Sequence, residues 1–178
     1  MKVIDEPLEQ LKLIELPYFC DHRGSFTKSF HAAQFHSLGI DFVAQEEFCS
    51  VSRRGVIRGM HFQLPPDDHA KLVFCPHGQI LDVAVDLRKA SPTYGEHFAT
   101  ELGEENHRAI FIPPGFAHGF LSLEDRSLVF YSVSSIHSPT NDRGIRWDSF
   151  GMDWRTTAPI ISDRDLQHPP LREFSSPF

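Results

Sequence analysis

The stretch KLVFCPHGQILDVAVD, residues 71–86, decides the fold because it places two strand-like runs on either side of one short turn. The alternation typical of strands is clearest in Lys71–Cys75 and Gln79–Asp86, and each run is bounded by turn-like residues. Pro76–Gly78 between them is typical of a turn. Such a connection is too short for the crossover helix that joins parallel strands, so the stretch favours an antiparallel architecture over α/β.

The same alternation of short apolar runs and turns continues toward the C-terminus. Ala109–Ile112 and Leu128–Val133 are predicted strands, and Ala90–Gly95 and Pro113–Gly115 are predicted turns. Sixteen Phe, thirteen Pro and eleven Gly fit the same pattern. The chain is therefore predicted to be all-β, a sandwich or barrel of antiparallel strands.

Two segments depart from this pattern. His31–Leu38 predicts one short helix, which Gly39 closes as a C-cap. From about Gly151 the chain is rich in Pro, Asp and Arg, and we expect a loop or short helices that pack on the barrel. Because the sequence shows no repeat, residues 1–178 are predicted to form a single domain.

The composition disfavours several classes of protein. The chain is 40% apolar and 23% charged, and no apolar run approaches the roughly 20 residues of a membrane span. The N-terminus lacks the pattern of a secretory signal, so we expect a soluble cytoplasmic protein without a membrane partner. A net charge of −7 disfavours a nucleic-acid binder. The odd number of cysteines predicts buried or half-buried reduced thiols at Cys20, Cys49 and Cys75.

Polar residues interrupt several of the strand-like runs. A single histidine or tyrosine on a strand is more often structural or solvent-facing than functional. The spacing of His61, Gln63, Lys71 and His118, however, resembles the two motifs of the cupin barrels, in which three histidines and a glutamate hold a metal ion. Here Gln63 replaces one histidine and Lys71 replaces the glutamate. Because an ammonium has no lone pair and two histidines alone make a poor site, the pattern predicts no metal.

The residues that remain favour proton transfer. His61 and His118 supply imidazoles, Lys71 supplies a cation and Tyr131 supplies a phenol. An imidazole can accept a proton from a carbon next to a carbonyl, a lysine can stabilise the enolate oxygen, and a phenol can return a proton. The set therefore suits proton transfer at a carbon beside a carbonyl group.

Longer segments carry a more specific resemblance. RGVIRGMHFQ, DVAVDLRKASPTYG, IPPGFAHGF and DRGIRWD, in this order, resemble the dTDP-4-dehydrorhamnose 3,5-epimerase family of cupin-type nucleotide-sugar epimerases. The resemblance runs from Asp21 to Asp165. It implies an antiparallel jelly-roll (cupin) barrel, an isomerase of carbohydrate biosynthesis, and a reaction without metal or other cofactor. It also implies a homodimer in which N-terminal strands are exchanged between barrels.

The resemblance further implies the catalytic residues. In the family a histidine paired with an aspartate removes protons beside the C4 ketone of the sugar, and a tyrosine returns one from the opposite face. Carried over by motif, His61 resembles the base and Tyr131 the acid. Asp165 resembles the partner of the base, with Asp163 as the alternative. Lys71 is placed like a lysine that contacts the enolate oxygen.

Substrate contacts are implied in the same way. Arg58 and Arg23 match arginines that meet the diphosphate, and Arg23 and Phe26 are expected to reach in from a partner subunit. His118 matches a second histidine that lines the site. Further contacts with the nucleotide sugar are expected at Glu46, Phe48, Gln63, His137 and Asp142.

Several positions depart from the family pattern. Glu46 stands where glutamine is usual, Phe48 where asparagine is usual, and Ile136–His137 where two tyrosines are usual. We therefore expect the proton chemistry to be kept, while the nucleotide and the sugar stay open. The default reaction converts dTDP-4-dehydro-6-deoxy-D-glucose to dTDP-4-dehydro-L-rhamnose. The alternatives are epimerisation at C3 or C5 alone on a CDP- or GDP-linked 4-keto sugar, a ketoisomerase, and a non-catalytic sugar-nucleotide binding cupin.

Overall fold

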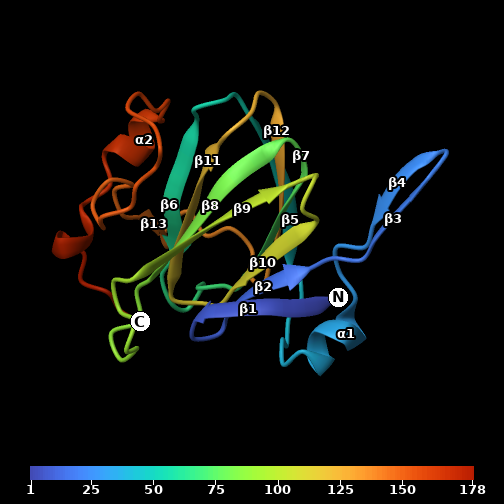
Figure 1. Ribbon diagram of the computed structural model, residues 1–178. Coiled ribbons are helices and arrows are strands. Elements are labelled where there is room, and N and C mark those ends of the chain that lie inside the picture. Colours follow the sequence, from blue (N-terminus) through green and yellow to red (C-terminus); the bar gives the residue numbers. More distant parts are fainter.

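Two antiparallel sheets face each other in the computed structural model, which describes residues 1–178 (Figure 1). The six-stranded sheet has the order β1 (Lys2–Leu8), β2 (Leu11–Glu15), β10 (Arg108–Ile112), β7 (Lys71–His77), β12 (Ser127–Val133) and β5 (Glu46–Ser52). The five-stranded sheet has the order β13 (Asp142–Gly144), β6 (Ile57–Gln63), β11 (Phe116–Ser122), β8 (Gln79–Asp86) and β9 (His97–Gly103). The predicted all-β, antiparallel jelly-roll (cupin) class is confirmed.

The predicted strands around residues 71–86 are confirmed, but they do not pair with each other. β7 pairs with β10 and β12 in the six-stranded sheet, whereas β8 pairs with β11 and β9 in the other sheet. Pro76 and His77, predicted as part of a turn, belong to β7, and Gly78 alone separates the two strands. The tight turn therefore carries the chain from one sheet to the other.

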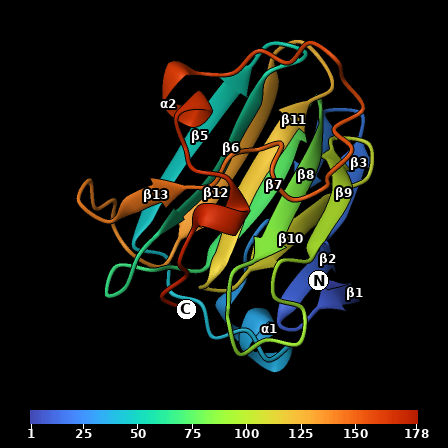
Figure 2. The same cartoon turned by 90° about the vertical axis from the view of Figure 1, so that its left-hand side faces the viewer.

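The sheets bury one core between them and a second core beneath the C-terminal tail (Figure 2). Ile80 and Ala84 of β8 belong to the core between the sheets, while Val83 and Val85 belong to the second core together with Trp154 of the tail. Burial of both faces explains why β8 reads as an almost continuous apolar run. The tail thus packs on the barrel, as predicted.

The helices are short and peripheral. The predicted helix is present as α1 (Ala32–Ser37), which buries Phe35 in a third cluster against the six-stranded sheet. The tail contains α2 (Asp163–Leu166) and one 3₁₀ turn, η1 (Leu171–Glu173). No helix of the structure is both long enough and apolar enough to cross a bilayer.

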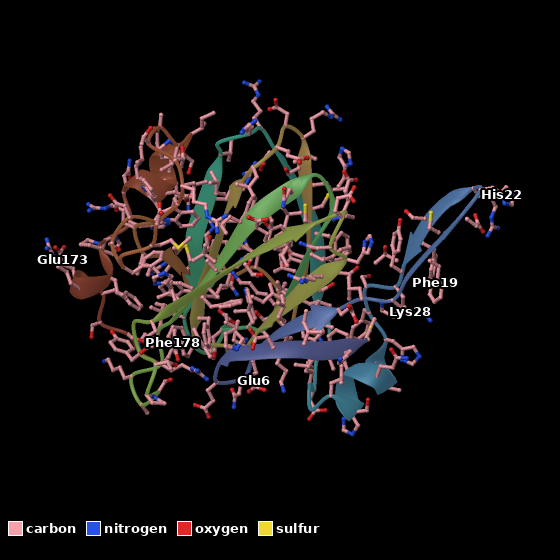
Figure 3. The ribbon with its side chains drawn as sticks, in the orientation of Figure 1. Glu6, Phe19, His22, Lys28, Glu173 and Phe178 are labelled. Carbon is pink, nitrogen blue, oxygen red and sulfur yellow. The ribbon has the colours of Figure 1, made fainter.

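A two-stranded hairpin, β3 (Tyr18–Asp21) and β4 (Gly24–Thr27), projects away from the two sheets (Figure 1). Figure 3 shows His22 at its tip, far from the body of the protein. Phe19 and Phe26 on this hairpin are 63% and 58% exposed. Because large apolar side chains seldom gather on a projecting arm without a partner, the hairpin has the character of a contact element.

The cysteines match the prediction only in part. All three are free thiols, and Cys75 is buried as expected. Cys20 and Cys49, however, are exposed, which corrects the expectation that they are buried or half-buried. The reason is topological, because Cys20 lies on the projecting hairpin and Cys49 on the edge strand β5.

Candidate active site

A cavity of about 640 Å³ lies between the two sheets. Strands β6 and β11 supply residues to one wall, β5, β7 and β12 supply the other, and tail residues 160–165 complete it. This volume suits a small-molecule ligand. All predicted site residues except Arg23 and Phe26 line the cavity: His61, Tyr131, Asp165, Lys71, Glu46, Phe48, Arg58, Gln63, His118, His137 and Asp142.

His61 on β6 and Asp165 on α2 form a hydrogen-bonded pair. Nε2 of His61 lies 2.7 Å from Oδ1 of Asp165, and the backbone N–H of Gly59 donates to Oδ2 at 3.1 Å. The side chain of Asp165 is 5% exposed and that of His61 is 29% exposed. Burial alone would raise the pKa of Asp165, but the hydrogen bond and charge of His61 and the Gly59 N–H lower it below its ordinary value. Asp165 is therefore an ionised, buried partner of the ring.

Two local features place Asp165 beside the ring. Ser162 caps α2, and its hydroxyl accepts the backbone N–H of Asp165 at 3.2 Å. Gly59 has a φ of +135°, and a Cβ there would lie 2.6 Å from Cα of Gly119 on β11. Only glycine fits that position, from which its N–H reaches the carboxylate. Asp163, the alternative partner, lies exposed on the same helix, so the geometry selects Asp165.

The pairing fixes which nitrogen of His61 is free. An ionised carboxylate only accepts hydrogen bonds, so Nε2 of the neutral ring carries the proton. Nδ1 then keeps its lone pair. A neutral imidazole held in this tautomer is able to accept a proton from a ligand in the cavity.

Lys71 enters the cavity from β7 on the opposite sheet. Its Nζ donates to the backbone oxygen of His61 at 3.1 Å, and the residue is 9% exposed. Burial lowers the pKa of Lys71 to about 8. Because an ammonium has three N–H donors, donors are left for an oxygen atom of a ligand.

Tyr131 on β12 also lies across the cavity from His61. The residue is 8% exposed, and its hydroxyl is 3.5 Å from Oγ of Ser50. Burial raises the pKa of Tyr131 well above its ordinary value, so the phenol stays protonated at neutral pH. A proton acceptor on one sheet therefore faces a proton donor on the other.

His118 is held by a second carboxylate. Its Nε2 lies 2.8 Å from Oδ2 of Asp82, and the two side chains are 4% and 0% exposed. The ring of His118 meets that of Tyr131 edge to face, with centroids 6.1 Å apart. His118 thus lines the wall in a fixed orientation, next to the phenol.

Charged groups form a chain at one side of the cavity. Oε2 of Glu46 accepts the backbone N–H of His137 at 2.6 Å, and Nε2 of His137 lies 3.2 Å from Oδ2 of Asp142. Arg164 of α2 donates to the same oxygen of Asp142 at 2.7 Å. These linked contacts connect β5, β13 and α2. They lie where the residues at 46 and 137 differ from the family pattern.

Arg58 and Phe48 lie on other parts of the wall. Nε of Arg58 donates to Oγ of Ser52 at 3.0 Å, which leaves most of the guanidinium donors unused by side chains. Such an arginine suits an anionic group with several oxygens. Phe48 stacks on Tyr131 with ring centroids 4.7 Å apart and an angle of 20°. The stack holds the phenol in place from the side of β5.

Gln63 is engaged by the protein at both ends of its amide. Its Nε2 donates to the backbone oxygen of Asp67 at 2.7 Å, and its Oε1 accepts the backbone N–H of Ser138 at 2.6 Å. Although Gln63 lines the cavity, these bonds occupy its polar atoms. Its position therefore shapes the wall and fastens the loop after β12.

The chain matches a family of known activity over nearly its whole length. The family described as dTDP-4-dehydrorhamnose 3,5-epimerase matches residues 5–173. The chain belongs to the dTDP-4-dehydrorhamnose 3,5-epimerase family. As a member of this family it is an isomerase, specifically a carbohydrate epimerase.

Similar proteins come from distant organisms. The dTDP-4-dehydrorhamnose 3,5-epimerase of Methanothermobacter thermautotrophicus is 42% identical over 177 residues, which cover 97% of this chain and 95% of the relative. The Legionella pneumophila dTDP-6-deoxy-D-glucose-3,5-epimerase, solved with dTDP-4-keto-L-rhamnose, has a TM-score of 0.93 and 32% identity over 98% of this chain and 94% of its own. The 3'-monoepimerase of Streptomyces bikiniensis, solved with dTDP-quinovose, has a TM-score of 0.88 and 32% identity over 94% and 86%.

Two residues expected at the site lie elsewhere in this epimerase. Arg23 and Phe26 belong to the projecting hairpin and do not line the cavity of their own chain. The guanidinium of Arg23 is held by Asp21 at 2.6 Å, on the surface. Neither residue therefore contributes to the cavity of its own chain.

Sequence reasoning missed three residues that line the cavity or support its lining residues. Asp82 is a carboxylate inside the apolar run of β8. A charged residue in a buried strand is an exception, and this exception could have identified Asp82 from the sequence. Arg164 and His168 flank Asp165 closely in sequence, but no periodic pattern distinguishes them. His61, Asp165 and His168 place three potential ligand atoms within 4.8 Å of one another. A metal ion there would replace the hydrogen bond that orients His61.

Proposed function

We propose that the protein converts dTDP-4-dehydro-6-deoxy-D-glucose to dTDP-4-dehydro-L-rhamnose by exchanging protons at C3 and C5, beside the C4 ketone. The observation that carries this proposal is the placement of the His61–Asp165 pair on one side of the cavity and of Tyr131 on the other. The activities of the similar proteins support the same substrate class. No cofactor is required, because each step moves only a proton.

His61 is the proposed base. Its Nδ1 takes the proton from C3 or C5, the C–H electron pair forms the enolate C=C bond, and the C=O π electrons move to O4. Asp165 stabilises the imidazolium that forms, as a buried carboxylate does for a catalytic histidine. Lys71 donates an N–H to the enolate oxygen, and a donor of this kind typically contributes about 10²- to 10³-fold to the rate.

Tyr131 is the proposed acid. It gives its hydroxyl proton to the enolate carbon from the face opposite His61, and the enolate electron pair forms the new C–H bond. The configuration inverts because removal and return occur on opposite faces. The phenolate then regains a proton from water and His61 loses one to water, which restores both groups. Burial, which raises the pKa of Tyr131, keeps the proton available at neutral pH.

The nucleotide portion is proposed to lie along Arg58, Glu46 and Phe48. Arg58 supplies donors for the diphosphate, and Phe48 offers an apolar ring that is 45% exposed. Glu46, Phe48 and His137 differ from the family pattern, so a CDP- or GDP-linked 4-keto sugar is the second candidate substrate. Epimerisation at C3 alone is the second candidate outcome, because the similar Streptomyces bikiniensis protein is a 3'-monoepimerase.

The functional unit is proposed to be a homodimer of single-domain chains in the cytoplasm. Strands β1 and β2 pair within their own sheet, so the element available for exchange is the β3–β4 hairpin. Its exposed Phe19 and Phe26 support a contact with a second barrel. Arg23 would then complete the site of the partner chain.

One experiment tests substrate and outcome together. The enzyme is incubated in D₂O with the dTDP-, CDP- and GDP-linked 4-keto-6-deoxy sugars, and deuterium at C3 and C5 is followed by NMR. We expect exchange and inversion at both carbons with the dTDP sugar. Exchange at C3 alone would change the proposal to a 3-epimerase, and movement of the ketone would indicate a ketoisomerase. Binding of every sugar without exchange at any carbon would overturn the enzymatic proposal.

A further inference from the structure

His168 lies beside the catalytic pair without lining the cavity. Its Nε2 is 3.7 Å from Oδ1 of Asp165, and its ring meets that of His61 edge to face, with centroids 5.7 Å apart and an angle of 76°. Its side chain is 13% exposed. The residues that line the cavity include His61 and Asp165 but not His168. The ring can therefore act on the carboxylate but not on the substrate.

The surrounding backbone holds this ring in a fitted space. Gly144 on β13 stands opposite His61 in the strand register, and a Cβ at Gly144 would overlap the ring of His168. The backbone oxygen of Pro169 accepts the N–H of Arg146 at 2.8 Å, which fastens the segment after α2 next to β13. The position of His168 is thus set by backbone on both sides.

The hydrogen bonds around Asp165 leave one polar atom unexplained. Oδ2 accepts from Gly59 and Oδ1 accepts from His61, whereas Nε2 of His168 is buried with no hydrogen-bond partner. Burial, together with the nearby charge of His61, lowers the pKa of His168, so its ring is neutral. A neutral ring has one N–H. With the proton on Nε2, that N–H faces the carboxylate, whereas with the proton on Nδ1 the lone pair of Nε2 would face the lone pairs of Oδ1.

We propose that His168 is a positioning residue whose Nε2–H points at Asp165 and limits how strongly that carboxylate holds a proton on His61. At 3.7 Å this N–H dipole acts on Oδ1 electrostatically and offsets part of its negative charge, so the imidazolium of His61 gains less from the carboxylate. His61 consequently stays neutral, and able to accept a proton, at lower pH. The inference rests on the proposed role of His61 as base.

The other charged groups near His168 and Asp165 stay the same when His168 is replaced. Arg164 and Asp142 act on His168 in opposite directions, and they are paired with each other at 2.7 Å. Lys71 contacts the backbone oxygen of His61 from the other sheet. None of these groups contacts the ring of His168 through a hydrogen bond, so replacing His168 leaves their own contacts in place and removes the N–H dipole 3.7 Å from Oδ1 of Asp165.

The pH profile of kcat/KM tests the inference. In His168→Leu, the acidic limb should move to higher pH by about half a unit or more, with KM nearly unchanged. His168→Gln, whose Nε2 can reach the same place, should restore the limb toward that of the wild type. Gln167→Leu, on the exposed neighbouring residue, is the matched control and should not move it. An unchanged limb in His168→Leu would overturn the inference.

A second measurement does not depend on activity or on a variant. In the ¹⁵N-labelled wild-type enzyme, long-range ¹H–¹⁵N correlation identifies the protonated nitrogen of each histidine. We expect the proton of His168 on Nε2, and a proton on Nδ1 would overturn the inference. A separate variant tests the proposed base role of His61, on which the inference rests. Normal exchange in His61→Asn would remove the base assignment itself, whereas an inactive His61→Asn with an unshifted His168→Leu profile removes only the role of His168.

Discussion

Nε2 of His61 and Oδ1 of Asp165 are 2.7 Å apart although 104 residues separate them in the sequence. The β6 strand delivers the ring, and a four-residue helix in the C-terminal tail delivers the carboxylate. The tail therefore supplies one half of the proposed catalytic pair and also covers the outer face of the five-stranded sheet. Trp154 of the tail packs in one cluster with Val83 and Val85 of β8, and this packing fixes the geometry of the proposed base.

Replacing the carboxylate should remove the orientation of the base. In Asp165→Asn, the amide can donate to Nε2 and favour the wrong tautomer, so kcat should fall by about 10³- to 10⁴-fold with the fold retained. Asp163→Asn, on the exposed residue two positions earlier, is the matched control and should stay near wild-type activity. Steady-state kinetics and circular dichroism make the comparison. Equal losses in the two variants would point to a general disturbance of α2.

Removing the phenol should separate the two halves of the reaction. Tyr131→Phe loses only a weak 3.5 Å contact with Ser50, so the melting temperature should change little. Proton abstraction by His61 should continue, while inverted product should fall by about 10²-fold or more. The ratio of deuterium exchange to epimerised product in D₂O gives the answer. A parallel fall of both quantities would show that Tyr131 has another role.

Lys71 predicts a basic limb in the pH profile. Burial lowers its pKa to about 8, and only the ammonium stabilises the enolate, so kcat should decline as pH rises through that value. Lys71→Met should lose this limb and about 10²- to 10³-fold of kcat. A wild-type limb that persists in Lys71→Met would assign it to another group.

The same residue predicts a pH effect on stability. The unfolded chain keeps the Lys71 proton up to about 10.5, whereas the folded protein releases it from about 8. Because the unfolded state binds more protons in this window, the free energy of unfolding should rise with pH there, relative to Lys71→Met. Denaturant unfolding of both proteins at pH 7 and pH 10 measures the difference. Equal pH dependence would contradict the burial of a titrating lysine.

Exchange of the hairpin predicts activity in mixed dimers. Arg23→Ala and His61→Asn should each be nearly inactive as pure proteins. After they are unfolded and refolded together, a mixed dimer pairs the intact cavity of one chain with the intact hairpin of the other. Recovery of about a quarter of wild-type activity is expected from random pairing. No recovery would place Arg23 outside the partner's site, and size-exclusion chromatography with light scattering verifies that dimers form.

The acidic residue at position 46 predicts a change in nucleotide affinity. Glu46 lines the cavity, so its negative charge should oppose the binding of a diphosphate there. Glu46→Gln should bind dTDP about two- to tenfold more tightly, with the largest effect at low salt. Glu47→Gln is the matched control, because successive side chains of β5 point to opposite faces. Isothermal titration calorimetry measures the affinity of both variants for dTDP. Equal changes in affinity would contradict a specific role of Glu46.

Part of the site was readable from the residues because it lies within continuous motifs. His61, Lys71, His118 and Tyr131 stand on strands with clear apolar patterns, so a polar residue there was visible as an exception. Asp82 had the same visibility and was overlooked. His168 had none, because it follows a four-residue helix in an irregular tail.

The sequence by itself determined the all-β class, the strands at 71–75 and 79–86, and the residue types of the proposed chemistry, because strand periodicity and turn residues are local properties. Only the tertiary structure decided that β7 and β8 lie in opposite sheets, that Asp165 and not Asp163 meets His61, and that Arg23 lies outside its own cavity. These outcomes depend on contacts between distant segments, which the packing of the two sheets and the tail sets and which no local pattern encodes.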